Sequence, residues 1–275
     1  DPFEEARFIA GRVLTFREEG ESLLESAVLF RAAFQGMQLE LELQKRGVPY
    51  IMRGGIRFFE QAHIKDVVSY LRVTANPADA LAWQRILRLE EGIGEKAAAL
   101  ITTALEHGNM ETLTEKIQAR GRAVVARVEH LKIVTHIDSM ILYILETFYE
   151  KYAEAQFENA RDRIEDLEQL ALFAKSYETL DQFLADATLS EGFRADRPSA
   201  TATATGAQKE YLVLSTIHQA KGLEWKNVFV IGLIDGQFPH HKSRARREEL
   251  EEERRLFYVA VTRAKARLFL TYAIA

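Results

Sequence analysis

Cysteine is absent from this chain, and so is any apolar run approaching the roughly 18 residues of a membrane span. Without cysteine there is no disulfide and no thiolate metal site, which is typical of the reducing cytoplasm. The start Asp1-Pro-Phe-Glu-Glu is acidic, whereas a secretory signal peptide begins with positive charge. We therefore expect a cytoplasmic protein without a membrane partner, and we assign no metal-ligating residue.

A large excess of charge of either sign is also lacking. The 36 basic and 41 acidic side chains give a formal net charge of −5, so no basic field covers the whole surface. Any contact with nucleic acid therefore has to come from local patches. With 47% apolar and 28% charged residues over 275 positions, the composition is that of a globular protein long enough for two domains.

The third absence is a G-x-x-x-x-G-K-[ST] loop, the segment whose backbone N–H groups and lysine hold nucleotide phosphates. Two blocks in the last third nevertheless carry the residue types of phosphate chemistry. They are Thr216-Ile-His-Gln-Ala-Lys-Gly-Leu-Glu224 and Glu251-Glu-Glu-Arg-Arg-Leu-Phe-Tyr-Val-Ala-Val-Thr-Arg-Ala-Lys265. Phosphate-handling residues without a loop to hold the phosphates predict half of a nucleotide-driven machine.

Strand and helix patterns alternate at both ends of the chain. Short apolar runs predict strands at 27–31, 48–52, 211–215, 227–232 and 267–272, the last of them buried. Helical spacing predicts helices at 3–18, 35–46 and 248–264. Strand, helix and strand within about 25 residues form a βαβ unit, so the sheet is expected to be parallel.

The middle of the chain, from Gln61 to Ala187, shows helical patterns only. The tract Ser199-Ala-Thr-Ala-Thr-Ala-Thr-Gly206 that follows has nothing to bury and predicts a flexible linker. We therefore predict an α/β fold in which an all-helical domain is inserted into a parallel-sheet domain.

Two arginines stand beside predicted strands. Arg31 ends the first strand, where ligands bind in open α/β sheets, and the adjacent Phe30 offers a ring for a base. Arg263 ends a helix, from which its fork can reach a phosphate in a transition state. The structural alternatives are a solvated strand end, a core phenylalanine, and a cation that compensates a helix C-terminus.

The block after the strand 211–215 crowds polar and glycine residues at one strand end. Thr216 and His218 offer hydrogen bonds, Lys221 a charge, and Gly222 close backbone approach, while Glu224 can accept from a ribose hydroxyl. A structural role for the same residues stays open.

A separate candidate lies in the helical region, at Gly92-Ile93-Gly94 with Lys96 shortly after it. A Gly-Ile-Gly turn between two helices points backbone N–H groups and a helix N-terminus outward, which suits a nucleic-acid phosphate without reading sequence. The alternative is a plain glycine-rich connection.

In their order along the chain, these blocks resemble the UvrD/Rep/PcrA family of superfamily 1 DNA helicases. Residues 27–31 look like motif IV, 216–224 like motif V and 251–264 like motif VI. The segments between them that also fit are Gly54-Gly-Ile-Arg-Phe-Phe-Glu60, Ile64-Lys-Asp66, Tyr70-Leu-Arg72, Gly92-Ile-Gly94 and Asp235-Gly-Gln-Phe-Pro239. The family commonly has an arginine at Gln61 and a glutamate at His63, so an ion pair between those positions is absent or changed.

The resemblance implies a RecA-like motor domain of residues 1–75 and 209–275, split by a helical subdomain of residues 76–208. It implies that Arg31 and Arg263 reach the γ-phosphate of ATP, that Phe30 lies beside the base, and that Glu224 contacts the ribose. Thr216 and His218 would couple ATP to single-stranded DNA, and the Gly92–Gly94 hairpin would touch duplex DNA at the fork.

The resemblance thus implies the C-terminal motor half of an ATP-dependent 3′→5′ helicase, monomeric as a fragment. The P-loop and the Mg²⁺ ligands are expected on an N-terminal RecA-like domain, so this chain alone is not expected to hydrolyse ATP. A non-enzymatic DNA-binding module and the helicase part of a helicase–nuclease recombination enzyme are the alternatives.

Overall fold

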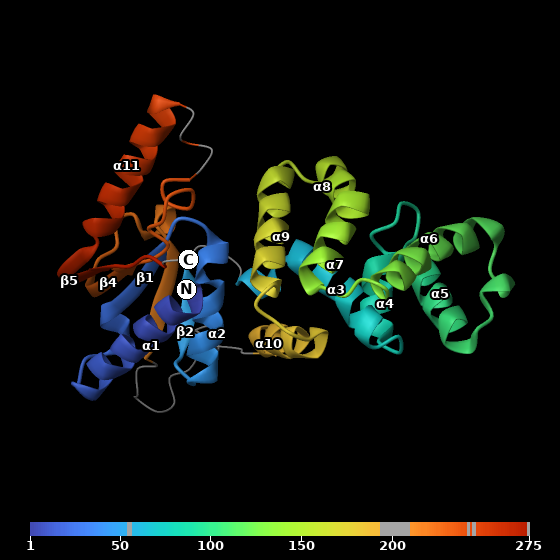
Figure 1. The fold of residues 1–275 in the computed structure, drawn as a ribbon, viewed down its shortest axis with the longest axis horizontal. Helices are drawn as coiled ribbons and strands as arrows, with labels where there is room; N and C mark the ends of the chain where they lie inside the picture. The colour runs from blue at the N-terminus through green and yellow to red at the C-terminus, as the bar shows by residue number, and fades with distance from the viewer. Residues whose placement is uncertain (54–56, 193–209, 241–242, 244–245, 274–275) are drawn as a thin grey trace. The chain divides into compact units, whose positions relative to one another are not determined.

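The computed structural model describes residues 1–53, 57–192, 210–240, 243 and 246–273 (Figure 1). It divides into two compact units, residues 1–58 with 189–275 and residues 59–188. We call them the sheet unit and the helical unit. The sequence predicted unit boundaries at residues 76 and 208. The predicted linker, residues 199–206, lies outside the described residues.

The sheet unit is built on five parallel strands, which confirms the predicted α/β fold. The strands are β1 (Ser26–Phe30), β2 (Tyr50–Arg53), β3 (Leu212–Thr216), β4 (Trp225–Val230) and β5 (Ala264–Leu270). Their order is β2-β3-β1-β4-β5. The strand β3, which follows the helical unit in sequence, thus lies between β1 and β2. The two segments of the sheet unit are interleaved in one sheet.

Each face of the sheet has its own apolar core. Helices α1 (Pro2–Glu18) and α2 (Met37–Lys45) pack against the face that carries Val28 and Phe30. Helix α11 (Arg247–Val261) and the connection between β3 and β4 pack against the opposite face, which carries Leu29. Because successive side chains of a strand point to opposite faces, β1 supplies both cores. All five of its residues are buried.

Strand β5 differs from the prediction of a buried strand. It lies at the edge of the sheet, where β4 is its only partner among the described strands. Lys265, Ala266, Leu268 and Leu270 are exposed. The prediction failed because an apolar run does not reveal whether a strand has one neighbour or two.

The helical unit contains no strand among its described residues, as the sequence predicted. Its helices are α3 (Ala62–Ala75), α4 (Ala80–Leu87), α5 (Glu95–His107), α6 (Glu115–Leu131), α7 (Ile137–Ile144), α8 (Glu150–Gln156) and α9 (Ala160–Ala174), with α10 (Leu180–Gly192) crossing the boundary. A π-helical turn, Leu145–Tyr149, joins α7 to α8. Helix α3 belongs to this unit and packs on α4, α6 and α9. This is why the boundary lies before α3.

Buried polar side chains tie α3 to the later helices. Nε2 of His63 lies 3.0 Å from Asp166 of α9, and Arg163 approaches the other ring nitrogen at 3.3 Å. Asp66 accepts hydrogen bonds from Arg85 at 2.7 Å and from the Tyr149 hydroxyl at 2.7 Å. His63 thus has partners on α9, about one hundred residues away. The sequence showed only that His63 replaces the glutamate common in the family, and did not reveal these partners.

Candidate functional site

Arg31 follows β1 at the carboxyl end of the sheet, on the side of α11. Its Nε donates to Oε1 of Glu253 at 2.8 Å. The backbone N–H groups of Arg31 and Ala32 donate to the side-chain oxygen of Gln35 at 2.8 and 3.1 Å. The Gln35 side chain therefore holds the backbone of the loop after β1, and the described residues fix the Arg31 guanidinium on one side only.

The remaining N–H groups of the Arg31 guanidinium are hydrogen-bond donors at this end of the sheet. A guanidinium carries five N–H donors, and the contact with Glu253 uses one of them. Among the described residues, no hydrogen bond from either Nη nitrogen is found. With 27% of its side chain exposed, Arg31 can offer a paired edge to a phosphate.

His218 and Thr216 lie at the same end. Thr216 is the last residue of β3 and is the register partner of Phe30, and Ile217 donates to the Phe30 carbonyl at 2.9 Å. The His218 side chain is exposed overall, yet the protein shields part of the ring. That shielding lowers the pKa of His218, and the nearby charge of Arg31 lowers the pKa further. The structure thus brings the end of the segment 27–31 next to the start of the block 216–224, although the two are far apart in sequence.

Phe30 does not have the surface position that stacking on a base requires. Its side chain is fully buried in the core under α1 and α2. A Cβ built on Gly36 would lie 3.0 Å from the ring, so Gly36 packs directly against it. The ring faces this core because Phe30 and Arg31 point to opposite faces of the sheet. The structural alternative, a core phenylalanine, describes its position.

Arg263 lies at the other end of the sheet and is largely occupied. It precedes β5, whose first residue pairs with Trp225 at the amino end of β4. Its Nε donates to the Val259 carbonyl at 2.9 Å, one Nη to the Leu223 carbonyl at 3.0 Å and the other to Thr262 at 3.1 Å. Three of its five donors are used: two bind the end of α11, as a cation compensating a helix C-terminus does, and one binds the connection before β4.

The sequence suggested that the block 216–224 lies at one end of the sheet, but the structure spreads the block over both ends. It leaves the carboxyl end of β3, forms a 3₁₀ turn at His218–Ala220 and returns to the amino end of β4. A connection between parallel strands has to make this return. Lys221 is exposed, Gly222 has a φ of +85°, and Glu224 lies 3.6 Å from Lys265. Glu224 is therefore near Arg263, away from Arg31.

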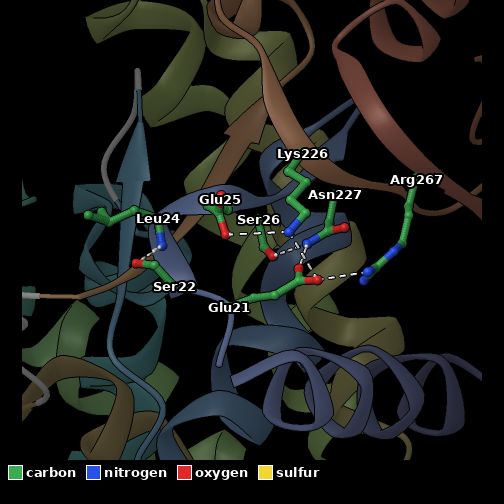
Figure 2. A network of polar contacts seen from close by, with 8 residues as sticks. All are labelled: Glu21, Ser22, Leu24, Glu25, Ser26, Lys226, Asn227 and Arg267. Carbon is green, nitrogen blue, oxygen red and sulfur yellow. Dashed lines mark hydrogen bonds and ion pairs between the residues drawn. The ribbon is translucent and has the colours of Figure 1, made fainter. Parts of the chain in front are cut away.

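A polar network that the sequence did not reveal holds the amino end of the sheet (Figure 2). Glu21 accepts from the Asn227 amide at 2.8 Å and from Arg267 at 2.7 Å, and Lys226 lies 3.1 Å away. The hydrogen bond from Asn227 holds the pKa of Glu21 below its usual value, with Lys226 and Arg267 adding to the effect. Glu21 sits in an ordinary acidic run, so only its three-dimensional partners distinguish it.

The glycine hairpin of the helical unit presents backbone and little else. Gly92 has a φ of +74°, and Gly94 begins α5 without any side-chain cap. The first N–H groups of α5 are therefore without an intrahelical partner. Lys96 is exposed in the first turn, whereas the Ile93 side chain is buried. The buried side chain of Ile93 anchors the hairpin, so only the backbone of Ile93 could make the predicted contact with DNA.

Arg120 of α6 is a basic residue at this hairpin that the sequence did not indicate. A Cβ built on Gly92 would fall 2.0 Å from its Nη1, so the guanidinium covers the glycine. The contact is possible because Gly92 has no side chain. It places a half-buried arginine beside the uncapped start of α5.

The family described as UvrD-like helicase C-terminal domain matches residues 2–274. The chain belongs to this family. Its RecA-like parallel sheet with a helical insertion agrees with that membership.

Individual relatives of this UvrD-like chain are helicases. DNA helicase II of Escherichia coli is 34% identical over 302 residues, which cover 98% of this chain and 40% of that protein. ATP-dependent DNA helicase PcrA of Bacillus subtilis is 31% identical, and UvrD1 of Mycobacterium tuberculosis is 32% identical. The chain thus spans about 40% of the length of the relatives it matches.

Two further features bear on partners of this UvrD-like domain. The described residues include no helix both long and apolar enough to cross a membrane. They also include no cluster of three or more histidine, aspartate or glutamate side chains arranged to hold a metal ion.

Proposed function

We propose that this chain is the C-terminal motor part of an ATP-dependent DNA helicase that moves 3′→5′ along single-stranded DNA. The observation that carries the proposal is Arg31. It stands at the carboxyl end of the sheet, and within the described part of the chain its guanidinium is held through Nε alone, which leaves both Nη nitrogens for a phosphate. Family membership and the helicase names of the relatives support the same function.

ATP would be held by a different set of residues than the sequence alone suggested. Arg31 would bind the γ-phosphate. Arg263 lies at the other end of the sheet, so it would contact a phosphate only by exchanging one of its contacts within the chain for a phosphate oxygen. Gly222 and Glu224 would lie along the ribose. Phe30 is not part of the proposed contact, because its ring is buried. Bound ATP supplies the phosphoryl group whose transfer to water drives the motor.

DNA contacts are proposed at both units. In the sheet unit, Thr216 and His218 lie near Arg31, and Lys221 follows the 3₁₀ turn that contains His218. These residues would contact the phosphate on one side and a bound DNA strand on the other. In the helical unit, Gly92, Gly94 and the first turn of α5 with Lys96 offer N–H groups and charge to a duplex phosphate. These contacts do not read sequence, as a helicase requires.

The lysine and Mg²⁺ ligands of the motor are proposed to come from an N-terminal RecA-like domain, since the relatives are longer than this chain. The test compares the 275-residue chain with the full-length protein in an ATPase assay with single-stranded DNA. We expect turnover only in the full-length protein. Turnover by the 275-residue chain would contradict the division of labour, and DNA binding without any ATPase in the full-length protein would favour a non-enzymatic binding module.

A further inference from the structure

Glu253 is the one residue of its acidic run on α11 that points into the protein. Its side chain is 6% exposed, whereas the Glu252 side chain is 65% exposed and pairs with Arg255 on the surface. Glu251 pairs in the same way with Arg254. A buried carboxylate is stable only when its oxygens are satisfied. The hydrogen-bond partners of the Glu253 carboxylate therefore indicate its role.

Each oxygen of Glu253 has its own partner. Oε1 accepts from Nε of Arg31 at 2.8 Å, and Oε2 accepts from the backbone N–H of His240 at 3.2 Å. His240 lies in the segment that follows β4. One carboxylate thus joins the end of β1, the helix α11 and the segment after β4.

Glu253 binds Arg31 in a way that leaves the two Nη nitrogens of the guanidinium open. A carboxylate that took Nε and Nη together in a two-bond contact would occupy the edge that binds phosphate. Here the second oxygen is used by His240 instead. Glu253 therefore holds the side chain by Nε while both Nη nitrogens stay available.

We propose that Glu253 is the positioning residue of Arg31, holding its guanidinium so that the Nη edge faces the nucleotide phosphate. This inference rests on the proposed function. It adds that the glutamate of motif VI acts through the arginine of motif IV, and that the backbone N–H of His240, after β4, holds the glutamate. Glu253 itself touches neither substrate nor reacting atoms.

The first test needs no nucleotide. In the 275-residue chain labelled with ¹⁵N-arginine, the Nε–H signal of Arg31 is identified by its loss in Arg31→Lys. We expect Glu253→Gln to shift this signal and speed its exchange with water, because the amide group would turn a donor toward Arg31 or His240. Glu252→Gln, the exposed control, is expected to leave the signal unchanged. An unchanged signal in Glu253→Gln overturns the proposal.

The second test is a double-mutant cycle on the ATPase of the full-length protein with single-stranded DNA. We expect Glu253→Gln to lower kcat about 10- to 100-fold, the scale of a misplaced catalytic group, with less change in KM for ATP. The double variant with Arg31→Ala should fall no further than Arg31→Ala alone, because Glu253 acts only through Arg31. Glu253→Asp, which keeps the charge, should recover part of the loss.

The outcomes separate this inference from the function on which it rests. Losses that multiply in the double variant, or a Glu253→Gln enzyme with normal kcat beside a slow Arg31→Ala enzyme, overturn the positioning role and leave the proposed function standing. Normal turnover in Arg31→Ala overturns both the phosphate contact and the positioning role. Melting curves of each variant show whether a loss comes from unfolding, and the Nε–H signal decides the matter for any variant that stays folded.

Discussion

The two ends of the parallel sheet use arginine in opposite ways. At the amino end, Arg267 pairs with Glu21, and Arg263 spends three donors on carbonyl and hydroxyl oxygens of the chain. At the carboxyl end, the guanidinium of Arg31 has a single side-chain partner among the residues that the structure describes, Glu253. Guanidinium donors that are satisfied inside the protein stabilise it, whereas open donors can bind a ligand. The same residue type thus serves the fold at one end and is available to a ligand at the other.

The difference follows from the connections at each end. At the amino end, Glu21 lies close enough to β1, β4 and β5 to bind side chains from two of these strands. At the carboxyl end, β1, β3 and β4 run into the turns after residues 30, 216 and 230. Turns that diverge leave polar groups without neighbours, which is the condition for a binding site.

The largest expected effect tests whether the open arginine at the carboxyl end is the phosphate contact. We expect Arg31→Ala in the full-length protein to lower kcat about 10³-fold or more, the scale of arginine-finger effects. The measurement is ATPase turnover with saturating single-stranded DNA.

The matched control is Arg267→Ala at the amino end, where the charge of the arginine is engaged by Glu21. It should reduce stability and leave kcat unchanged. If Arg263→Ala also keeps its turnover and only melts earlier, Arg263 is a helix-end cation, and the phosphate contact belongs to the carboxyl end alone.

Phe30 offers the next effect, because core packing and base stacking predict different losses. Phe30→Ala should lower the free energy of unfolding by about 3–5 kcal/mol, as expected for a large ring removed from a core. Urea denaturation of the 275-residue chain measures it. Phe30→Leu, which keeps most of the apolar packing, should leave the KM for ATP unchanged in the full-length protein. A large rise in KM with unchanged stability would restore the base-stacking role.

The hairpin extends the comparison to the helical unit. Gly94→Glu places a negative charge at the uncapped start of α5, so we expect several-fold weaker binding of forked DNA by the full-length protein. ATPase stimulated by single-stranded DNA should stay intact. Thr103→Glu, with the same charge at an exposed position later in α5, is the control. Equal loss of both activities in Gly94→Glu would contradict a duplex-specific role.

The smallest effect concerns the Glu21 network. Because the pKa of Glu21 is lower in the folded than in the unfolded protein, its charge contributes stability above the unfolded value. This contribution is lost as pH falls through the folded pKa. Glu21→Gln should therefore be less stable than the parent chain at neutral pH, and the two should converge in acid. Urea midpoints across that range measure the difference, and a constant gap would contradict the assignment.

Much of the sheet unit could be predicted because its signals are local. The apolar run 27–31 and the helical spacing of 248–264 appear as β1 and α11 with small shifts of their ends. The site was predicted less well. Arg31 and the end of β3 do meet, but Phe30 and Ile93 are buried, and Glu253, Glu21 and Arg120 carry no pattern that distinguishes them from surface charges.

By itself, the sequence determined the parallel α/β fold, the helical insertion and the family, since strand length, helical period and ordered motifs are properties of neighbouring residues. Only the tertiary structure decided that β3 lies between β1 and β2, and that Phe30 faces the core while Arg31 faces α11. It also decided that a glutamate 222 positions away holds Arg31. Contacts between segments so far apart depend on how the whole chain packs, and no local pattern records them.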